Sequence, residues 1–123
     1  MSRTPVDLFV FGSRNKGPRP PRVGIDIFPD EQGMVGPEPP NSPTGASAYG
    51  DTAQSGLTGH YYLLPAGTEL PLGLDAIADG MDVRPDSLQK PTHYTIFPTQ
   101  RMTAEQFLAA FERLPWQYAG KQK

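Results

Sequence analysis

Prolines and glycines divide this chain into short segments. Its 123 residues include 15 prolines and 13 glycines, and these occur in clusters that separate stretches with a regular apolar pattern. Proline breaks the hydrogen bonding of helices and sheets, and glycine favours turns. The sequence therefore predicts one ordered domain, residues 1–123, in which short elements are joined by long, stiff loops around a small core.

Four segments rich in apolar and β-branched residues are predicted as strands: 6–11, 23–28, 59–65 and 92–97. The second shows the clearest alternation of apolar residues, which is typical of a half-buried strand. Residues 29–51 are expected to form a long loop, and a loop of this length in a small domain is usually functional or disordered. Residues 75–78 are expected to form at most one helical turn.

One helix is predicted near the C-terminus. Thr103 and Gln106 have the spacing of a capping box, and Pro115 cannot continue a helix. We expect a helix over residues 104–114 that covers a sheet in which residues 92–97 form a central or near-central strand. The residues expected to face the sheet at helical spacing are Phe107, Leu108, Phe111 and Leu114.

The predicted fold class is α+β, with small, mostly antiparallel sheets and a C-terminal helix. The last residues, 116–123, are expected to dock through Trp116 and Tyr118 and to end in a frayed basic tail.

Composition excludes several classes of protein. A net charge of -2 gives no general attraction to nucleic acid or to an anionic membrane. The absence of cysteine excludes disulfides and thiolate chemistry, and two histidines without ligand spacing argue against a metal site. The start of the chain does not resemble a signal peptide, and no apolar run is long enough to span a membrane. We therefore expect a cytoplasmic protein that, if exported, leaves without a cleaved leader.

His93 is an unusual residue for the middle of a strand. On the strand expected at residues 92–97 it shares a face with Thr95 and Phe97. The imidazole is equally compatible with a structural hydrogen bond at the sheet surface and with a role in a functional site.

Two further segments carry polar groups. Residues 44–49 place hydroxyl groups and Tyr49 behind a glycine, although an ordinary turn has the same composition. Arg14, Arg19 and Arg22 lie in a proline-rich loop that could hold a phosphate, although solvated charges are the commoner explanation.

Four stretches together resemble a known family. They are DEQGMVGP (30–37), TGASAYGD (44–51), YYLLPAGTELP (61–71) and THYTIFPTQRM (92–102). Their order and separation resemble the Tse-type cytotoxic effectors of the bacterial type VI secretion system, specifically the second of that exported series. The resemblance implies a fold similar to the ADP-ribosyltransferase toxins, with NAD as substrate and no metal.

One position departs from the resemblance. Many relatives have an aromatic residue followed by arginine in the first strand, where a basic residue usually holds the dinucleotide, whereas here Phe9 is followed by Val10. Arg14, just beyond the strand, is the expected substitute. The departure favours a non-catalytic relative that acts by binding, and the intact downstream motifs favour an enzyme.

The resemblance also implies site residues. The expected catalytic residues are His93, Ser47 and Glu69, with Asp75 as an alternative carboxylate, and the expected cofactor-binding residues are Tyr49, Tyr94, Arg14 and Thr44. Breaking the bond between nicotinamide and ribose builds positive charge on the ribose, which requires an aromatic wall, hydrogen-bond partners and a stabilising group.

The implied function is that of a toxin that ADP-ribosylates a cytoplasmic target or hydrolyses NAD and so stops the growth of a recipient cell. Such a toxin endangers its producer, so a cognate immunity protein is expected to cover the cleft around Ser47 and His93. Neither a membrane nor a nucleic acid is expected as a partner.

Overall fold

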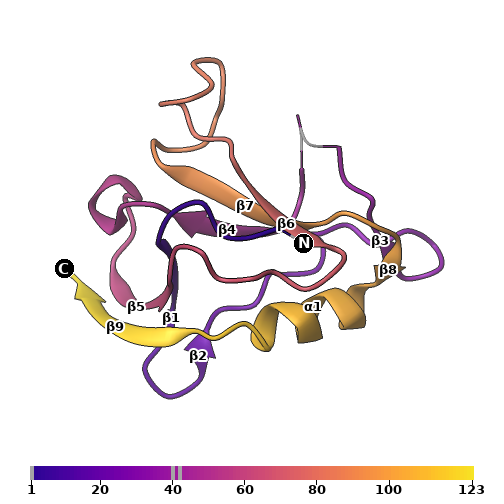
Figure 1. Cartoon of the computed structure of the whole chain (residues 1–123), viewed down its shortest axis with the longest axis horizontal. Coiled ribbons are helices and arrows are strands. Elements are labelled where there is room, and N and C mark those ends of the chain that lie inside the picture. The colour runs from indigo at the N-terminus through magenta and orange to yellow at the C-terminus, as the bar shows by residue number, and fades with distance from the viewer. Residues whose placement is uncertain (1, 40, 42) are drawn as a thin grey trace.

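The computed structural model describes residues 2–39, 41 and 43–123 as one large sheet, one small sheet and a helix (Figure 1). The large sheet has the order β6-β7-β4-β1-β5-β9, with β2 also paired to β1, and the small sheet pairs β3 with β8. Strand bounds are β1 Leu8–Ser13, β2 Gly17–Pro18, β3 Met34–Val35, β4 Ala46–Tyr49, β5 Gly59–Leu64, β6 Leu74–Ala78, β7 His93–Pro98, β8 Met102–Thr103 and β9 Gln117–Gln122.

The fold class agrees with the prediction. All pairings between these strands are antiparallel, and the α-helix α1 (Ala104–Glu112) follows the last strand of the small sheet, which gives an α+β arrangement. Three predicted strands are confirmed, with small shifts at their ends, as β1, β5 and β7. β7 pairs on both sides, with β4 and β6, and is therefore an interior strand, as expected.

The hydrophobic core joins α1 to one face of the large sheet. Phe107 and Phe111 of the helix are fully buried, as predicted. Each such side chain contributes about 1.5–3 kcal/mol by leaving water. The strand residues in the same apolar cluster are Leu8, Val10, Ala46, Ala48, Leu64, Leu74 and Ile96.

The helix begins as its sequence predicts. The Thr103 hydroxyl accepts from the Gln106 backbone N–H at 3.0 Å, and the Gln106 side chain accepts from the Thr103 backbone N–H at 2.9 Å. The last helical residue is Glu112, two positions before the expected end. The Trp116 indole N–H donates to the Phe111 carbonyl at 2.9 Å, which satisfies an acceptor in the last turn and fixes the residues beyond it.

The segment with the clearest alternation is not a strand, so that prediction was wrong. Val23 and Ile25 are 59% and 60% exposed, and only Ile27 of the alternating set is buried. The chain turns here because the Asp26 carboxylate accepts from the Arg22 backbone N–H at 2.8 Å and Gly24 has a φ of 84°. These local bonds take the place of ladder bonds to a neighbouring strand.

Residues 44–49 and 75–78 also differ from expectation. Residues 46–49 form strand β4 and residues 75–78 belong to strand β6 of the large sheet, rather than to a turn or a helical turn. β4 packs so closely on β7 that a Cβ at Gly45 would lie 2.0 Å from the Ile96 carbonyl oxygen, so only glycine fits there. The long loop of residues 29–51 is thus shorter than predicted and also contains β3; residues 40 and 42 lie outside the described part of the chain.

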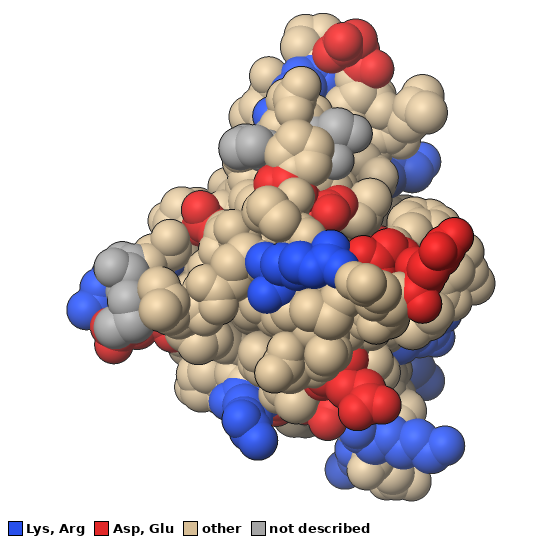
Figure 2. All heavy atoms as spheres, turned by 90° about the vertical axis from the view of Figure 1, so that its right-hand side faces the viewer, with Lys and Arg blue, Asp and Glu red and all other residues tan. Residues whose placement is uncertain are grey.

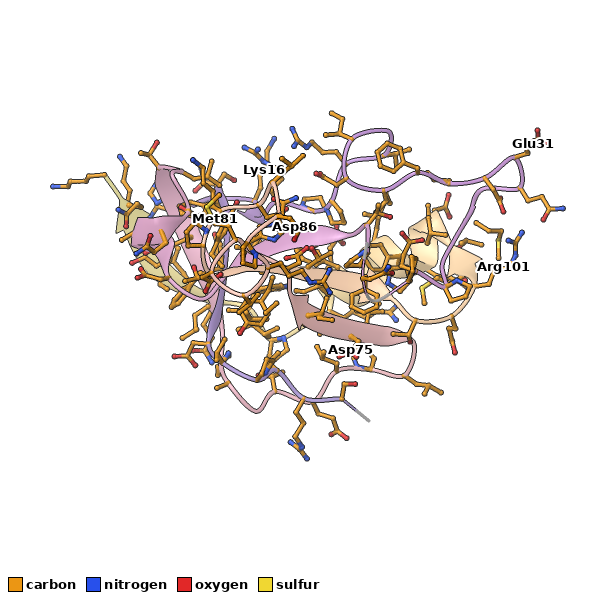
Figure 3. The ribbon with its side chains drawn as sticks, turned by 90° about the horizontal axis from the view of Figure 1, so that it is seen from above. Lys16, Glu31, Asp75, Met81, Asp86 and Arg101 are labelled. Carbon is orange, nitrogen blue, oxygen red and sulfur yellow. The ribbon has the colours of Figure 1, made fainter. Side chains whose placement is uncertain are left out.

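The C-terminal segment and the turn before β3 are both held by contacts with other parts of the chain. Residues 117–122 form the edge strand β9 against β5, so the basic end of the tail, which was expected to fray, is paired through Gln122. The turn before β3 carries Glu31 at its tip and lies close to Arg101 (Figure 3), and Arg101 pairs with Asp30 at 2.9 Å. Backbone N–H groups, chiefly that of Met34, hold the pKa of the Asp30 carboxyl below its usual range.

Candidate active site

The large sheet is split between β1 and β4. These strands meet at a single pair, Phe9 opposite Tyr49, whereas β1 pairs with β5, and β4 with β7, over several residues. In Figure 1 the strands β4, β6 and β7 lie across the middle of the molecule, and β1, β5 and β9 lie at its lower left. The sheet therefore consists of two well-paired halves joined at Tyr49, with a crevice beside the junction.

The crevice has a volume of about 260 Å³. Its lining comes from both halves of the sheet and from the turn that follows β2: Val10, Phe11, Arg19, Pro20, Pro21, Arg22, Asp26, Ala46, Ser47, Tyr49 and Leu57. Phe11 and Tyr49 form an aromatic wall, with ring centroids 6.4 Å apart. Ser47 is exposed although its neighbours Ala46 and Ala48 are buried, so its hydroxyl is available to a ligand.

Charged groups occupy one side of the crevice. The Arg22 Nε lies 3.1 Å from the Asp26 carboxylate, which also accepts from the Arg22 backbone N–H. Arg19 is exposed and makes no side-chain hydrogen bond or ion pair with the residues that the structure describes. The lining therefore carries one paired and one unpaired guanidinium.

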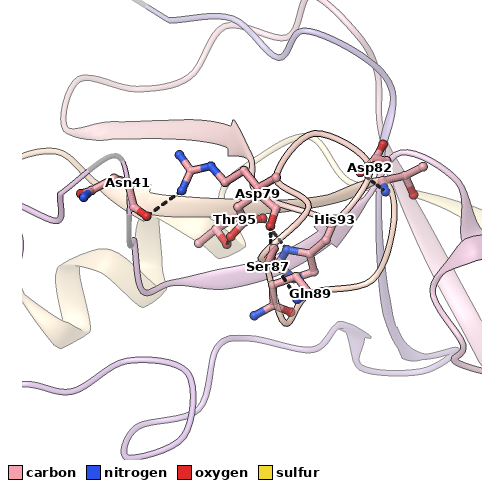
Figure 4. A network of polar contacts seen from close by, with 9 residues as sticks. Asn41, Asp79, Asp82, Ser87, Gln89, His93 and Thr95 are labelled. Carbon is pink, nitrogen blue, oxygen red and sulfur yellow. Dashed lines mark hydrogen bonds and ion pairs between the residues drawn. The ribbon is translucent and has the colours of Figure 1, made fainter.

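A buried polar network lies next to the crevice (Figure 4). His93 Nδ1 lies 2.5 Å from one oxygen of the Asp79 carboxylate, and the Thr95 hydroxyl donates to the other at 2.6 Å. His93 is 1% exposed and Asp79 is 7% exposed. The other imidazole nitrogen, His93 Nε2, is buried and has no hydrogen-bond partner among the described residues.

The loop of residues 80–92 covers Asp79. The Ser87 hydroxyl donates to the Asp79 backbone carbonyl at 2.5 Å, and the Gln89 backbone N–H donates to the Ser87 hydroxyl at 3.0 Å. The Asp79 backbone N–H in turn donates to the His93 carbonyl at 3.0 Å. Both the backbone and the side chain of Asp79 are therefore fixed against β7.

Tyr49 separates this network from the crevice. Its ring meets that of His93 edge to face, with centroids 5.2 Å apart and an interplanar angle of 83°. Burial, together with the negative charge of Asp79, raises the pKa of the Tyr49 phenol above its ordinary value. Tyr49 is consequently neutral at physiological pH and provides the crevice with an uncharged aromatic surface.

The structure brings together three of the predicted site residues. Because Tyr49 is opposite His93, and Ser47 is opposite Thr95, all four side chains point to the sheet face away from α1. Ser47 and Tyr49 line the crevice, whereas His93 lies behind Tyr49. The sequence predicted the shared face, but it did not show that His93 would be buried.

The other predicted residues lie elsewhere. Tyr94 packs against the core on the opposite face of β7, and both the hydroxyl and the backbone N–H of Thr44 are bound to Glu38. Arg14 lies over the Tyr118 ring, 5.9 Å from its centroid. Glu69 lines a separate hollow at the C-terminal end of α1.

The predicted carboxylates, Glu69 and Asp75, therefore do not line the crevice. Asp75 is on β6 (Figure 3), where its carboxylate accepts from the adjacent Ala76 N–H at 2.8 Å. The carboxylate in the crevice lining is Asp26, and the one bound to His93 is Asp79. Neither belongs to a recognisable motif; the only signal for Asp79 is a charged residue directly after an apolar segment.

No group of three or more His, Asp or Glu residues in the described part of the chain could hold a metal ion. On the face shown in Figure 2, acidic and basic side chains form small separate groups among uncharged residues. Among the described residues of this face, the basic side chains do not form one continuous surface.

Comparison with known proteins identifies the family. A search of curated proteins finds no significant match. The family model described as Tse2 ADP-ribosyltransferase toxin matches residues 6–120, from just before β1 through α1 and into β9. The resemblance drawn from the four sequence stretches is thereby confirmed, and the chain belongs to the Tse2 ADP-ribosyltransferase toxin family.

Proposed function

We propose that this toxin binds the nicotinamide end of NAD in the crevice between β1 and β4 and transfers the ADP-ribose to a target molecule. The observation that carries this proposal is the lining of one crevice by an exposed serine, two aromatic rings and two arginines. Family membership supports the reaction type. The crevice supports the position of the site.

The lining suits the chemistry of the reaction. When the bond to ribose breaks, nicotinamide leaves with the electron pair, and the positively charged ribose is then attacked by a nucleophile of the target or by water. Tyr49 and Phe11 offer a surface for the nicotinamide ring, Ser47 a hydrogen bond to ribose, and Asp26 a negative charge near the developing cation. Pockets for drug-sized ligands measure roughly 300–1,000 Å³. The crevice, at about 260 Å³, is slightly smaller and so accommodates one end of the dinucleotide.

His93 has an indirect role in this proposal. The sequence suggested a direct bond from the imidazole to ribose or to the nicotinamide amide. Its contact with the crevice runs through the Tyr49 ring, and Asp79 fixes its orientation. We therefore assign His93 as a positioning residue for the aromatic wall.

The proposal is tested with NAD labelled in its adenylate half. The purified protein is incubated with labelled NAD and a bacterial lysate, and both free nicotinamide and label on an acceptor are measured. Transfer yields both products, and hydrolysis yields nicotinamide without a labelled acceptor. Absence of nicotinamide release would contradict catalysis and favour the binding alternative.

Ser47→Ala tests the position of the site. Loss of an ordinary hydrogen bond costs about 0.5–1.5 kcal/mol, and loss of one that forms mainly in the transition state costs about 3 kcal/mol or more. We expect nicotinamide release to fall by about 10-fold or more while the melting temperature is unchanged, because Ser47 is exposed. Ser13→Ala is the matched control, an exposed serine at the end of β1 outside the crevice lining. Equal activity of the two variants would place the site elsewhere.

We further propose that the toxin acts on a cytoplasmic target in a recipient cell and that an immunity protein protects the producer by covering the crevice. In support, Val23, Ile25 and Phe28 are exposed beside the crevice residues Arg22 and Asp26, which offers apolar area to a partner. No helix in the described residues is long and apolar enough to cross a membrane. Co-expression with the neighbouring open reading frame should restore growth; a protein harmless on its own would remove the reason for such a partner.

A further inference from the structure

The turn between β2 and the Asp26 loop presents two arginines to the crevice on a rigid support. Its sequence is Arg19-Pro20-Pro21-Arg22, and all four residues line the crevice. The Arg19 backbone N–H donates to the Phe11 carbonyl of β1 at 3.0 Å, Pro21 is buried, and Arg22 is held by Asp26. Two prolines and these contacts leave the backbone little freedom, so ligand binding requires little additional ordering.

The positive charge of the crevice comes from this turn. β1 contributes the apolar Val10 to the lining, and the guanidinium of Arg14 lies over Tyr118 instead. Asp26 offsets one of the two crevice charges through its contact with Arg22 Nε. Arg19 has no ion-pair partner in the described part of the chain, and it lines the crevice together with the aromatic wall and Ser47.

This arrangement fits a phosphate group of the substrate. The planar guanidinium binds phosphate oxygens with two parallel hydrogen bonds, which a lysine ammonium cannot reproduce. In NAD the pyrophosphate is joined to the nicotinamide ribose through one carbon atom, so a ribose bound at Ser47 has its pyrophosphate close by. Ser47 and Arg19 line that crevice together.

We propose that the Arg19–Arg22 turn binds the pyrophosphate of NAD, with Arg19 as the residue that determines affinity and Arg22 as a second donor oriented by Asp26. This inference rests on the proposed function, because it assumes that the nicotinamide ribose occupies the same crevice.

The test compares a ligand that has the pyrophosphate with one that does not. The first is a carbocyclic NAD analogue, which retains the pyrophosphate but cannot release nicotinamide. The second is nicotinamide riboside, which lacks both the pyrophosphate and the adenosine. Binding of each is measured by calorimetry for the wild type and for Arg19→Ala, Arg19→Lys and Arg113→Ala. Arg113→Ala is the control for loss of an exposed arginine outside the crevice.

We expect Arg19→Ala to weaken binding of the NAD analogue by about 10- to 100-fold, the range for a hydrogen bond to a charged group. Arg19→Lys should recover only part of this loss, and Arg113→Ala should bind like the wild type. Binding of nicotinamide riboside should be the same in all four proteins, and higher salt should weaken binding of the analogue alone.

Two results would overturn the inference while leaving the proposed function intact. One is equal affinity of Arg19→Ala and the wild type for the analogue, and the other is an equal loss of both ligands, which would show that Arg19 shapes the crevice rather than binding phosphate. If the wild type binds neither ligand, the proposed function fails and the inference fails with it.

Discussion

Asp79 is expected to be the polar side chain on which this small fold depends most. Its carboxylate accepts from His93 Nδ1 and from the Thr95 hydroxyl, and all three residues are buried. In Asp79→Ala both donors lose their acceptor in the interior, and each unsatisfied buried group costs about 1–3 kcal/mol. The sum, roughly 2–6 kcal/mol, is a large part of the 5–15 kcal/mol typical of a whole domain.

Asp79→Asn separates the effect of shape from that of charge. The amide retains the size of the side chain but only one acceptor oxygen, so one of the two donors loses its acceptor. The hydrogen bond that remains is no longer charge-assisted and has about half the strength. We expect a loss of about 1–2 kcal/mol, smaller than that of the alanine variant. We therefore expect the free energy of unfolding to be highest for the wild type, lower for Asp79→Asn and lowest for Asp79→Ala.

Urea unfolding followed by circular dichroism measures these differences, provided that the m-value stays constant. Asp75→Ala is the matched control, because its carboxylate accepts only from the adjacent backbone N–H in the described structure. That variant should lose no more than about 1 kcal/mol. If Asp79→Ala were as stable as Asp75→Ala, the reasoning about buried unsatisfied donors would be refuted.

Three further variants test the core, the helix cap and the tyrosine at the junction. Phe107→Ala should lower the free energy of unfolding by about 3–5 kcal/mol, since this side chain is fully buried; a loss below 1 kcal/mol would contradict the packing of α1. Thr103→Ala should cost about 1 kcal/mol, measured against Thr99→Ala, which is outside the cap. Above about pH 10 the unfolded state releases the Tyr49 phenolic proton more readily than the folded state, whose pKa is raised, so this group lowers stability as the pH rises. Tyr49→Phe should therefore lose less stability than the wild type between about pH 9 and pH 11, and identical slopes would count against the raised pKa.

The features that the sequence predicts well are those set by neighbouring residues. The capping box joins Thr103 and Gln106, three positions apart, and the buried face of α1 follows from helical spacing. Strand β7 was recognisable because its β-branched and aromatic residues form one run that ends at a proline. Tertiary contacts do not alter such signals.

The errors arise where other contacts, either local or distant in sequence, override the pattern of a segment. The alternation of residues 23–28 was overridden by a turn that Asp26 stabilises through Arg22. Residues 75–78 lie among turn residues and show no clear strand pattern of their own, yet they pair with β7. Residues 117–122 likewise pair with β5. Strand formation in these segments depends on a partner that the segment itself does not specify.

The candidate site was partly predictable for the same reason. Strand periodicity placed His93 and Thr95 on one face, and the family resemblance singled out Ser47. Asp79, the partner of His93, lies 14 residues away in sequence, directly after strand β6. The pairing of β6 with β7 brings the two residues together. The catalytic roles assigned from the resemblance remain predictions.

The proposed site lies where the two halves of the large sheet share the fewest ladder pairs, between β1 and β4. Ser47 is carried by β4, which is paired along its length with β7, and Arg19 is tied to β1, which is paired along its length with β5. In the described part of the chain, Phe9 and Tyr49 form the single ladder pair between these two halves. Tyr49, which packs against both Phe11 and His93, therefore lies where the hydroxyl of one half and the guanidinium of the other meet the crevice.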